Sequence, residues 1–222
     1  MSSIPFDAFE NTRWYFNHMM KTGGRTAIEV IRQAHKDAAT APICRWLFVS
    51  EHKMCEFVDW DITATIIREP TSRLLSHYRM LMQHELSDFS LPHHREASFG
   101  SDDPVWLGDN FEDFLIDFPN KWKLHQLHFY SESADVDEAF NNITQNTQII
   151  LFERRKEGFD RLAKKVGLDP ALFQDQQAPE WQTTKNISFE VDDNQASKMK
   201  KVLEKEYEFY NRVINYYNEE KI

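Results

Sequence analysis

The sequence has few cysteines, an excess of acidic over basic residues and no long apolar run, and each of these excludes a class of protein. Its 222 residues include only Cys44 and Cys55, without a CxxC spacing. A disulfide framework is therefore excluded, and we expect free buried thiols in a reducing compartment. No apolar run is long enough to span a bilayer, so we expect no membrane span. The opening residues, MSSIPFDAFENTR, lack a basic region followed by an apolar one, which predicts a cytoplasmic protein without a secretory signal.

The charge balance argues against a general polyanion binder. The chain has 26 Lys and Arg against 36 Asp and Glu, a net charge of -10. Proteins that bind nucleic acids usually present a basic face, so we expect no nucleic-acid partner, although a local basic pocket is compatible with this composition. Hydrophobic content of 41% and charged content of 28% are typical of a soluble globular chain. The length favours a single domain, residues 1–222.

Apolar runs alternate with helical patterns along the chain. Apolar or β-branched runs predict strands at 14–19, 46–49, 61–67 and 148–152. Periodic apolar positions predict helices at 26–35, from Pro70 onward, at 111–118, 122–130, 136–142 and 156–166, and from Asp192 or Asp193 onward. Segments 86–108 and 168–190 are predicted to be irregular, and the first to shape a binding site. The alternation predicts an α/β fold with a central, mainly parallel sheet flanked by helices.

Residues 13–26, RWYFNHMMKTGGRT, combine a predicted strand, a basic loop and the start of a helix. The two glycines let the backbone turn sharply and approach an anion. The first N–H groups of the helix, together with its dipole, favour a phosphate there, and Lys21 adds a mobile cation. Taken alone, this stretch also fits an ordinary strand-to-helix turn with a surface lysine.

Residues 63–78 form a second stretch that fits a phosphate site. Arg68 ends a predicted strand, and ligands of open α/β sheets collect at the carboxyl ends of strands. Pro70 fits the first turn of the next helix, and Ser76 lies opposite its apolar stripe of Leu74, Leu75, Tyr78, Leu81 and Met82. Arg68 and Ser76 could thus hold a phosphate. The alternative is an Arg68 paired with Glu69 or another carboxylate, and a solvated Ser76.

Together the two stretches resemble a known family. H-x-x-K-T-G-G followed by R-x-P-x-x-R-x-x-S-x-Y is similar to the sulfotransferases that use 3′-phosphoadenosine 5′-phosphosulfate (PAPS). The similarity is closest to the carbohydrate O-sulfotransferase branch, which includes the heparan sulfate 2-O-sulfotransferases. The matching residues are His18, Lys21, Thr22, Gly23, Gly24, Arg68, Pro70, Arg73, Ser76 and Tyr78. The resemblance implies a P-loop-like three-layer sandwich and transfer of a sulfuryl group to an acceptor hydroxyl of a carbohydrate or small alcohol.

The resemblance also implies roles for individual residues. The loop residues Lys21, Thr22, Gly23, Gly24, Arg25 and Thr26 would surround the 5′-phosphosulfate, and Arg68 and Ser76 would hold the 3′-phosphate. The family usually has Thr or Ser at the position of Arg25 and Pro at that of Met20. Arg25 therefore either adds a charge contact or points to solvent.

Sulfuryl transfer needs a cation at the leaving phosphate and a base at the acceptor hydroxyl. Lys21 is the predicted cation, and His52 is the predicted base because it follows the strand run 46–49. Glu51, Glu56 and Asp59 are rival bases. The chemistry requires no metal, and because the chain has no HExxH or Cys/His cluster we expect no metal site among the remaining histidines, which include His77, His84, His93, His94, His125 and His128.

Two other functional classes stay open. A P-loop phosphotransferase (a kinase) would use ATP and magnesium, but Lys21 precedes both glycines and the GxxxxGK[ST] order is missing. A non-catalytic nucleotide-binding module would keep Lys21, Arg68 and Ser76 and would need no base.

Overall fold

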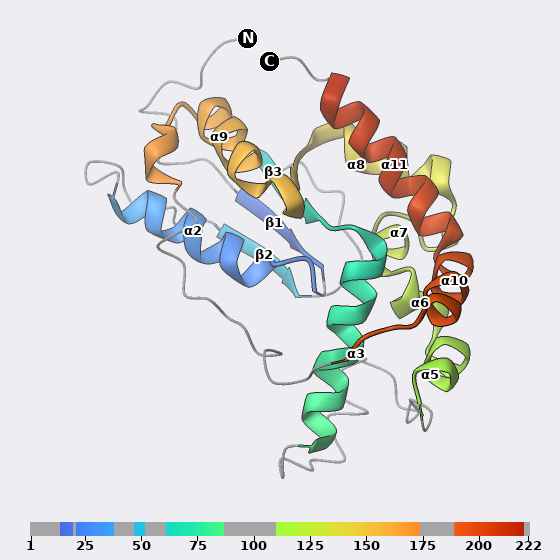
Figure 1. Cartoon of the computed structure of the whole chain (residues 1–222). Helices are drawn as coiled ribbons and strands as arrows, with labels where there is room; N and C mark the ends of the chain where they lie inside the picture. The colour runs from blue at the N-terminus through green and yellow to red at the C-terminus, as the bar shows by residue number, and fades with distance from the viewer. Residues whose placement is uncertain are drawn as a thin grey trace.

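The computed structural model describes residues 14–19, 21–37, 47–51, 61–86, 110–173 and 189–219. Within these ranges a parallel sheet has the strand order β2-β1-β3-β4 (Figure 1). Its strands are β1 (Trp14–His18), β2 (Leu47–Glu51), β3 (Ile62–Ile67) and β4 (Thr147–Leu151). Each lies within two residues of a predicted strand, which confirms an α/β fold with a parallel sheet.

Helices fill most of the other described segments. They are α2 (Gly24–Asp37), α3 (Pro70–Leu86), α5 (Phe111–Asp117), α6 (Asn120–Lys123), α7 (His125–Tyr130), α8 (Val136–Asn146), α9 (Arg155–Val166), α10 (Asp193–Val202) and α11 (Glu204–Glu219). Two short 3-10 helices, η1 (Phe152–Arg154) and η2 (Pro170–Leu172), flank α9. None of the helices in these ranges is both long and apolar enough to cross a membrane.

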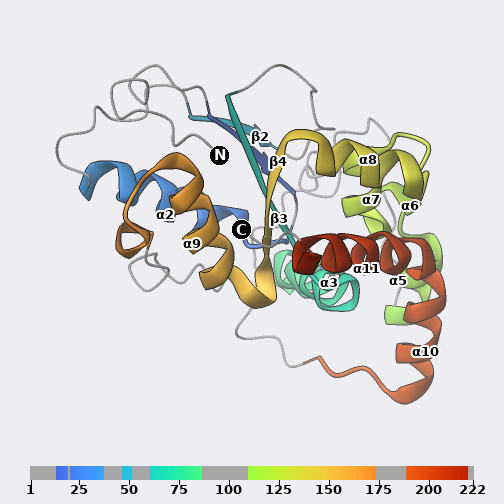
Figure 2. The same ribbon diagram turned by 90° about the horizontal axis from the view of Figure 1, so that it is seen from above.

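Helices cover both faces of the sheet because its strands are apolar on both sides. Side chains alternate along a strand, so the neighbours Tyr15 and Phe16 enter different apolar clusters. The cluster around Phe16 joins the sheet to α2 and α9, whereas the cluster around Tyr15 joins it to α3, α7, α8 and α11. Seen from above, the strands stand between these two groups of helices (Figure 2).

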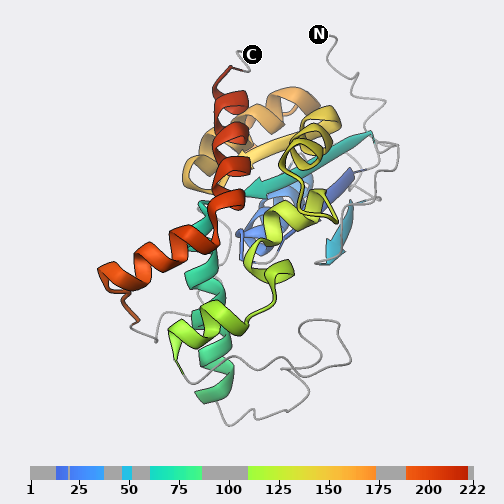
Figure 3. The ribbon, with the colours of Figure 1, turned by 90° about the vertical axis from the view of Figure 1, so that its right-hand side faces the viewer.

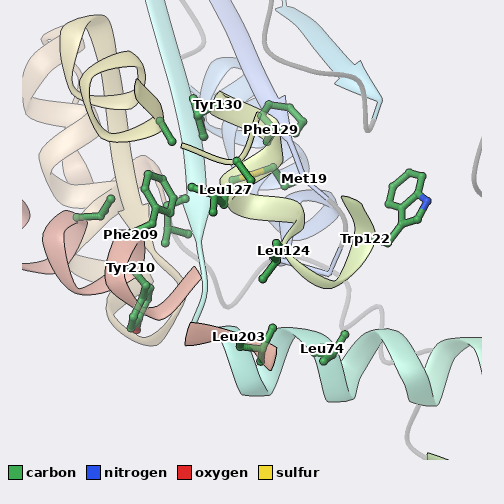
Figure 4. Packing of buried hydrophobic residues seen from close by; sticks show 14 of the residues in the cluster. Met19, Leu74, Trp122, Leu124, Leu127, Phe129, Tyr130, Leu203, Phe209 and Tyr210 are labelled. Atoms are coloured by element: carbon green, nitrogen blue, oxygen red, sulfur yellow. The ribbon is translucent and has the colours of Figure 1, made fainter. Parts of the chain in front are cut away.

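The larger cluster is built from segments far apart in the sequence. Figure 4 shows Met19, just after β1, and Leu74 of α3 together with apolar side chains of α7 and α11, all of them buried. Burying a Leu or Phe side chain contributes about 1.5–3 kcal/mol. This cluster therefore fixes α3, α7 and α11 against one face of the sheet.

Helix boundaries follow local signals where those signals exist. Pro70 begins α3 as predicted. Gly167 ends α9 with a left-handed φ of 74°, also as predicted. Asp192 caps α10 in a capping box with Gln195, which settles the choice between Asp192 and Asp193.

Two long predicted helices were wrong, since each is two helices. The predicted helix 122–130 is α6 and α7, divided at Leu124, and the predicted last helix is α10 and α11, divided at Leu203. Figure 3 shows the change of direction between α10 and α11. Leu124 and Leu203 are both buried in the larger cluster, so the chain breaks where the packing of an apolar residue outweighs helix continuity. The other differences are at single helix ends or strand ends: α2 begins at Gly24 instead of Thr26, α8 ends at Asn146 instead of residue 142, and Phe152 lies in η1 instead of a strand.

Candidate functional site

The candidate site lies where the direction of chain winding reverses in the sheet. From β1 the chain passes to β2 on one side, and from β3 it passes to β4 on the other side. The helix α2, which follows β1, packs on one face, while α3, which follows β3, packs on the opposite face. β1 and β3 are parallel neighbours, so the segments that leave their carboxyl ends separate there. Open α/β sheets bind ligands in the crevice at such a point. Lys21 and Arg68 are in these two segments.

The loop after β1 has a tightly fixed backbone. Lys21 has a φ of 64° and Gly23 a φ of 87°, both in the left-handed region. Thr22 is fully buried, and its hydroxyl donates a hydrogen bond to the carbonyl of Met19 at 3.0 Å. The left-handed conformation costs an L-residue about 1–2 kcal/mol, so the surroundings of Lys21 must hold it there.

Both glycines of the loop lie in close contact with neighbouring side chains. A Cβ on Gly23 would lie 2.7 Å from Cε2 of Phe152, and the φ of Gly23 would strain any other residue. A Cβ on Gly24 would overlap the imidazole of His18. The glycines therefore let the loop lie directly against Phe152 and the end of β1, with α2 starting at once.

Arg68 joins the two predicted phosphate segments. Its Nη1 donates to the carbonyl of Lys21 at 3.0 Å, across 47 residues of sequence. Its guanidinium lies over the ring of Phe152, 4.4 Å from the centroid. Burial lowers the pKa of Arg68, and the nearby Glu153 opposes this effect. The alternative was an Arg68 paired with Glu69 or another carboxylate. Glu153 and Glu69 both act electrostatically on Arg68, but in the described ranges its guanidinium contacts the Lys21 carbonyl and the Phe152 ring.

Glu69 instead caps α3. Its carboxylate accepts the backbone N–H of Thr71 at 3.1 Å and that of Ser72 at 2.6 Å, and the hydroxyl of Tyr207 also donates to it. Burial works to raise the pKa of Glu69, but these hydrogen bonds outweigh it and the pKa is lowered. Burial and the same contact raise the pKa of Tyr207 to about 12. The carboxylate of Glu69 therefore occupies the N-terminus of α3.

The remaining predicted site residues are described to different extents. Ser76 is half-buried in α3 and Ser72 is exposed, whereas Leu74 and Tyr78 are buried, as the predicted stripe requires. Thr26 is half-buried in the first turn of α2. Arg25 is described only as backbone in α2 and Glu51 only as the last residue of β2.

The predicted base and several other residues lie outside the described part of the chain. These are His52, Glu56, Asp59, Met20 and residues 87–108 of the predicted irregular segment 86–108. The base for the acceptor hydroxyl therefore stays a prediction. Of the histidines considered for a metal, His77 and His125 are buried against the rings of Phe118 and Trp122. In the described ranges, no group of three His, Cys, Asp or Glu side chains is placed to hold a metal ion.

A buried polar network contacts the backbone of Arg68, and the sequence analysis did not predict it. Arg73 and Glu206 are fully buried, and Nε of Arg73 donates to Oε1 of Glu206 at 2.9 Å. Arg73 also donates to the carbonyls of Trp122 and Lys123. Gln126, likewise fully buried, donates to Glu206 at 3.1 Å and contacts the backbone of Arg68.

The spacing of apolar residues contained a signal for part of this network. Arg73 falls on the buried stripe of α3, beside Leu74 and one turn before the buried His77. Glu206 falls on the buried stripe of α11, three residues after Leu203 and before Phe209. Opposite charges on the apolar stripes of two helices predict a buried pair, because an isolated buried charge is too costly. No comparable signal marks Gln126.

No protein-family model matches this chain, and a search of curated proteins finds no significantly similar sequence.

Proposed function

We propose that this protein is a PAPS-dependent sulfotransferase with a P-loop-like three-layer sandwich fold. In this proposal the nucleotide lies across the loop after β1 and the Arg68 segment. The hydrogen bond of 3.0 Å between Arg68 and the Lys21 carbonyl carries the proposal. It joins the two stretches that resemble the family, and it does so at the reversal point of the sheet.

The hydrogen bonding of Arg68 supports an anionic ligand. Within the described part of the chain, its buried Nε has no hydrogen-bond acceptor. An unsatisfied buried donor costs about 1–3 kcal/mol, and more when the group is charged. A phosphate oxygen is a strong acceptor for a guanidinium and would remove this cost. Burial also lowers the pKa of Arg68, and a desolvated cation gains most from a bound anion.

The proposed reaction is an in-line displacement at sulfur. The acceptor oxygen forms a bond to sulfur as the bond between sulfur and the 5′-phosphate oxygen breaks, and the acceptor proton passes to the base. Lys21 and the loop N–H groups stabilise charge on the leaving phosphate, where losing one donor typically costs about 100- to 1,000-fold in rate. His52 is the proposed base, with Glu51, Glu56 and Asp59 as alternatives. The acceptor is a hydroxyl of a carbohydrate or small alcohol.

Calorimetric titration with 3′-phosphoadenosine 5′-phosphate (PAP) tests the nucleotide site. We expect micromolar affinity for PAP and weaker binding of ATP with magnesium. Arg68→Ala should abolish PAP binding. The matched control is Arg212→Ala, since that arginine of α11 pairs with Asp137 at 2.5 Å and lies over Phe140. Tighter binding of ATP with magnesium would refute the sulfotransferase proposal in favour of a phosphotransferase.

Turnover with PAPS separates an enzyme from a binding module. Lys21→Ala should abolish sulfuryl transfer, and near-normal activity of this variant would refute the assigned role. His52→Ala should leave PAP binding intact and lower the rate by roughly 100- to 10,000-fold, the usual contribution of a general base. If His52→Ala transfers the sulfuryl group at the wild-type rate, the base is instead Glu51, Glu56 or Asp59.

A further inference from the structure

The side chain of Gln126 makes two hydrogen bonds to the backbone of Arg68. Its Oε1 accepts the Arg68 N–H at 2.7 Å, and its Nε2 donates to the Arg68 carbonyl at 2.8 Å. The last paired residue of β3 is Ile67, opposite Leu151. Arg68 is thus the first residue beyond the sheet, and the Gln126 carboxamide takes the place of a neighbouring strand for its backbone groups.

The orientation of the Gln126 carboxamide is fixed by its contact with Glu206. Oε1 of Glu206 accepts from Nε2 of Gln126 at 3.1 Å and from Nε of Arg73 at 2.9 Å. A carboxylate held by a guanidinium can only accept, so the donor end of Gln126 must face it. The acceptor end then faces the Arg68 N–H. All three side chains are fully buried, which excludes exchange of these partners for water.

We infer that Gln126 is a positioning residue, held by the Arg73–Glu206 pair, that sets where the Arg68 guanidinium meets the phosphate of the nucleotide; this inference rests on the proposed function. With its backbone fixed by Gln126, Arg68 extends over Phe152 to the Lys21 carbonyl. The same contact joins Arg68 to the backbone of Lys21, which has a left-handed φ of 64°. Gln126 therefore controls the geometry of both phosphate segments without contacting the ligand.

Gln126→Met tests the inference, because methionine nearly keeps the volume but cannot bond the Arg68 backbone. Two measurements are made on the folded protein, after circular dichroism has confirmed folding. The first is hydrogen exchange of the Arg68 amide by NMR, which needs no nucleotide. The second is calorimetric titration with PAP. We expect faster exchange at the Arg68 amide and an affinity for PAP weakened about tenfold or more, as expected from the loss of two hydrogen bonds.

Gln126→Glu is the second variant, and it gives a pH signature that a purely structural role would not. When protonated, the new carboxyl group has one donor and one acceptor and can reproduce the contacts of the amide. When ionised, it meets the carboxylate of Glu206. We therefore expect PAP affinity near that of the wild type at pH 5 and a fall toward the Gln126→Met value by pH 8, with the wild type measured at each pH as reference.

The two measurements on Gln126→Met test the backbone contact and the positioning role separately. Unchanged Arg68 exchange in Gln126→Met would overturn the backbone contact, and unchanged PAP affinity in a folded Gln126→Met would overturn the positioning role. If Gln126→Met does not fold, the pH dependence of Gln126→Glu decides, and a flat profile relative to the wild type overturns the inference. A wild-type protein that binds no PAP would refute the proposed function, while the exchange measurement would still report on Gln126 itself.

Discussion

Replacing Arg73 with methionine should destabilise the protein strongly, in a way that depends on pH. Arg73→Met removes the guanidinium that contacts Glu206 at 2.9 Å and the donors to two backbone carbonyls. Both side chains of the ion pair are completely buried. Removing one partner of such a pair typically costs about 3–5 kcal/mol, because the other charge is left buried. Few domains have more than about 5–15 kcal/mol to lose, so the unfolding midpoint should move markedly.

The pH dependence follows from the state of Glu206. Burial raises the pKa of Glu206 in the native protein, and Arg73 opposes that rise. Without Arg73 the native pKa rises further, while the unfolded value stays near that of an ordinary glutamate. Between these two pKa values the native variant binds a proton that the unfolded chain does not, so its free energy of unfolding grows as the pH falls. The loss relative to the wild type should be largest near pH 7.5 and smaller near pH 5.

Urea unfolding followed by circular dichroism at pH 5 and pH 7.5 measures both effects. Arg73→Met combined with Glu206→Met should be more stable than Arg73→Met alone at pH 7.5, because no buried charge remains. The matched surface control is Glu112→Gln, which breaks the exposed pair with Lys198 and should cost less than about 1 kcal/mol. A loss below 1 kcal/mol for Arg73→Met, or the same loss at both pH values, would refute the reasoning.

Three further predictions concern the loop and the neighbouring helices. Lys21→Gly should be about 1–2 kcal/mol more stable to urea than Lys21→Ala, because glycine relieves the φ of 64°, and equal stability would contradict this. Gly24→Ala should lose about 1–3 kcal/mol in the same assay through overlap with His18, despite the better helix propensity of alanine; a gain would show that the loop can move. Lys123→Met should lose about 1–3 kcal/mol, because the buried Nζ of Lys123 donates to the last carbonyls of α5. The control is Lys121→Met, at a neighbouring exposed position, and its free energy of unfolding should stay within about 0.5 kcal/mol of that of the wild type.

Much of the fold was predictable because its signals are local. Pro70, Gly167 and Asp192 mark helix ends through their own backbone preferences and side-chain bonds, and the structure has those ends there. The parallel strands are buried on both faces, so their apolar runs stand out in the sequence. The divisions at Leu124 and Leu203 were not predictable, because the apolar period continues through both and only packing in the larger cluster breaks the helix.

The candidate site, like the fold, was predictable only in part. The sequence by itself determined the two segments with Lys21 and Arg68, since a glycine pair after a strand and an arginine before a proline-led helix are patterns of neighbouring residues. Only the tertiary structure decided that Arg68 bonds the Lys21 carbonyl and that Gln126 holds the Arg68 backbone, across 47 and 58 residues. It also decided that Glu69 serves α3 instead of pairing with Arg68. These contacts depend on how β1, β3 and α7 are brought together, and no spacing in the sequence indicates that Arg68 will meet the Lys21 carbonyl or Gln126.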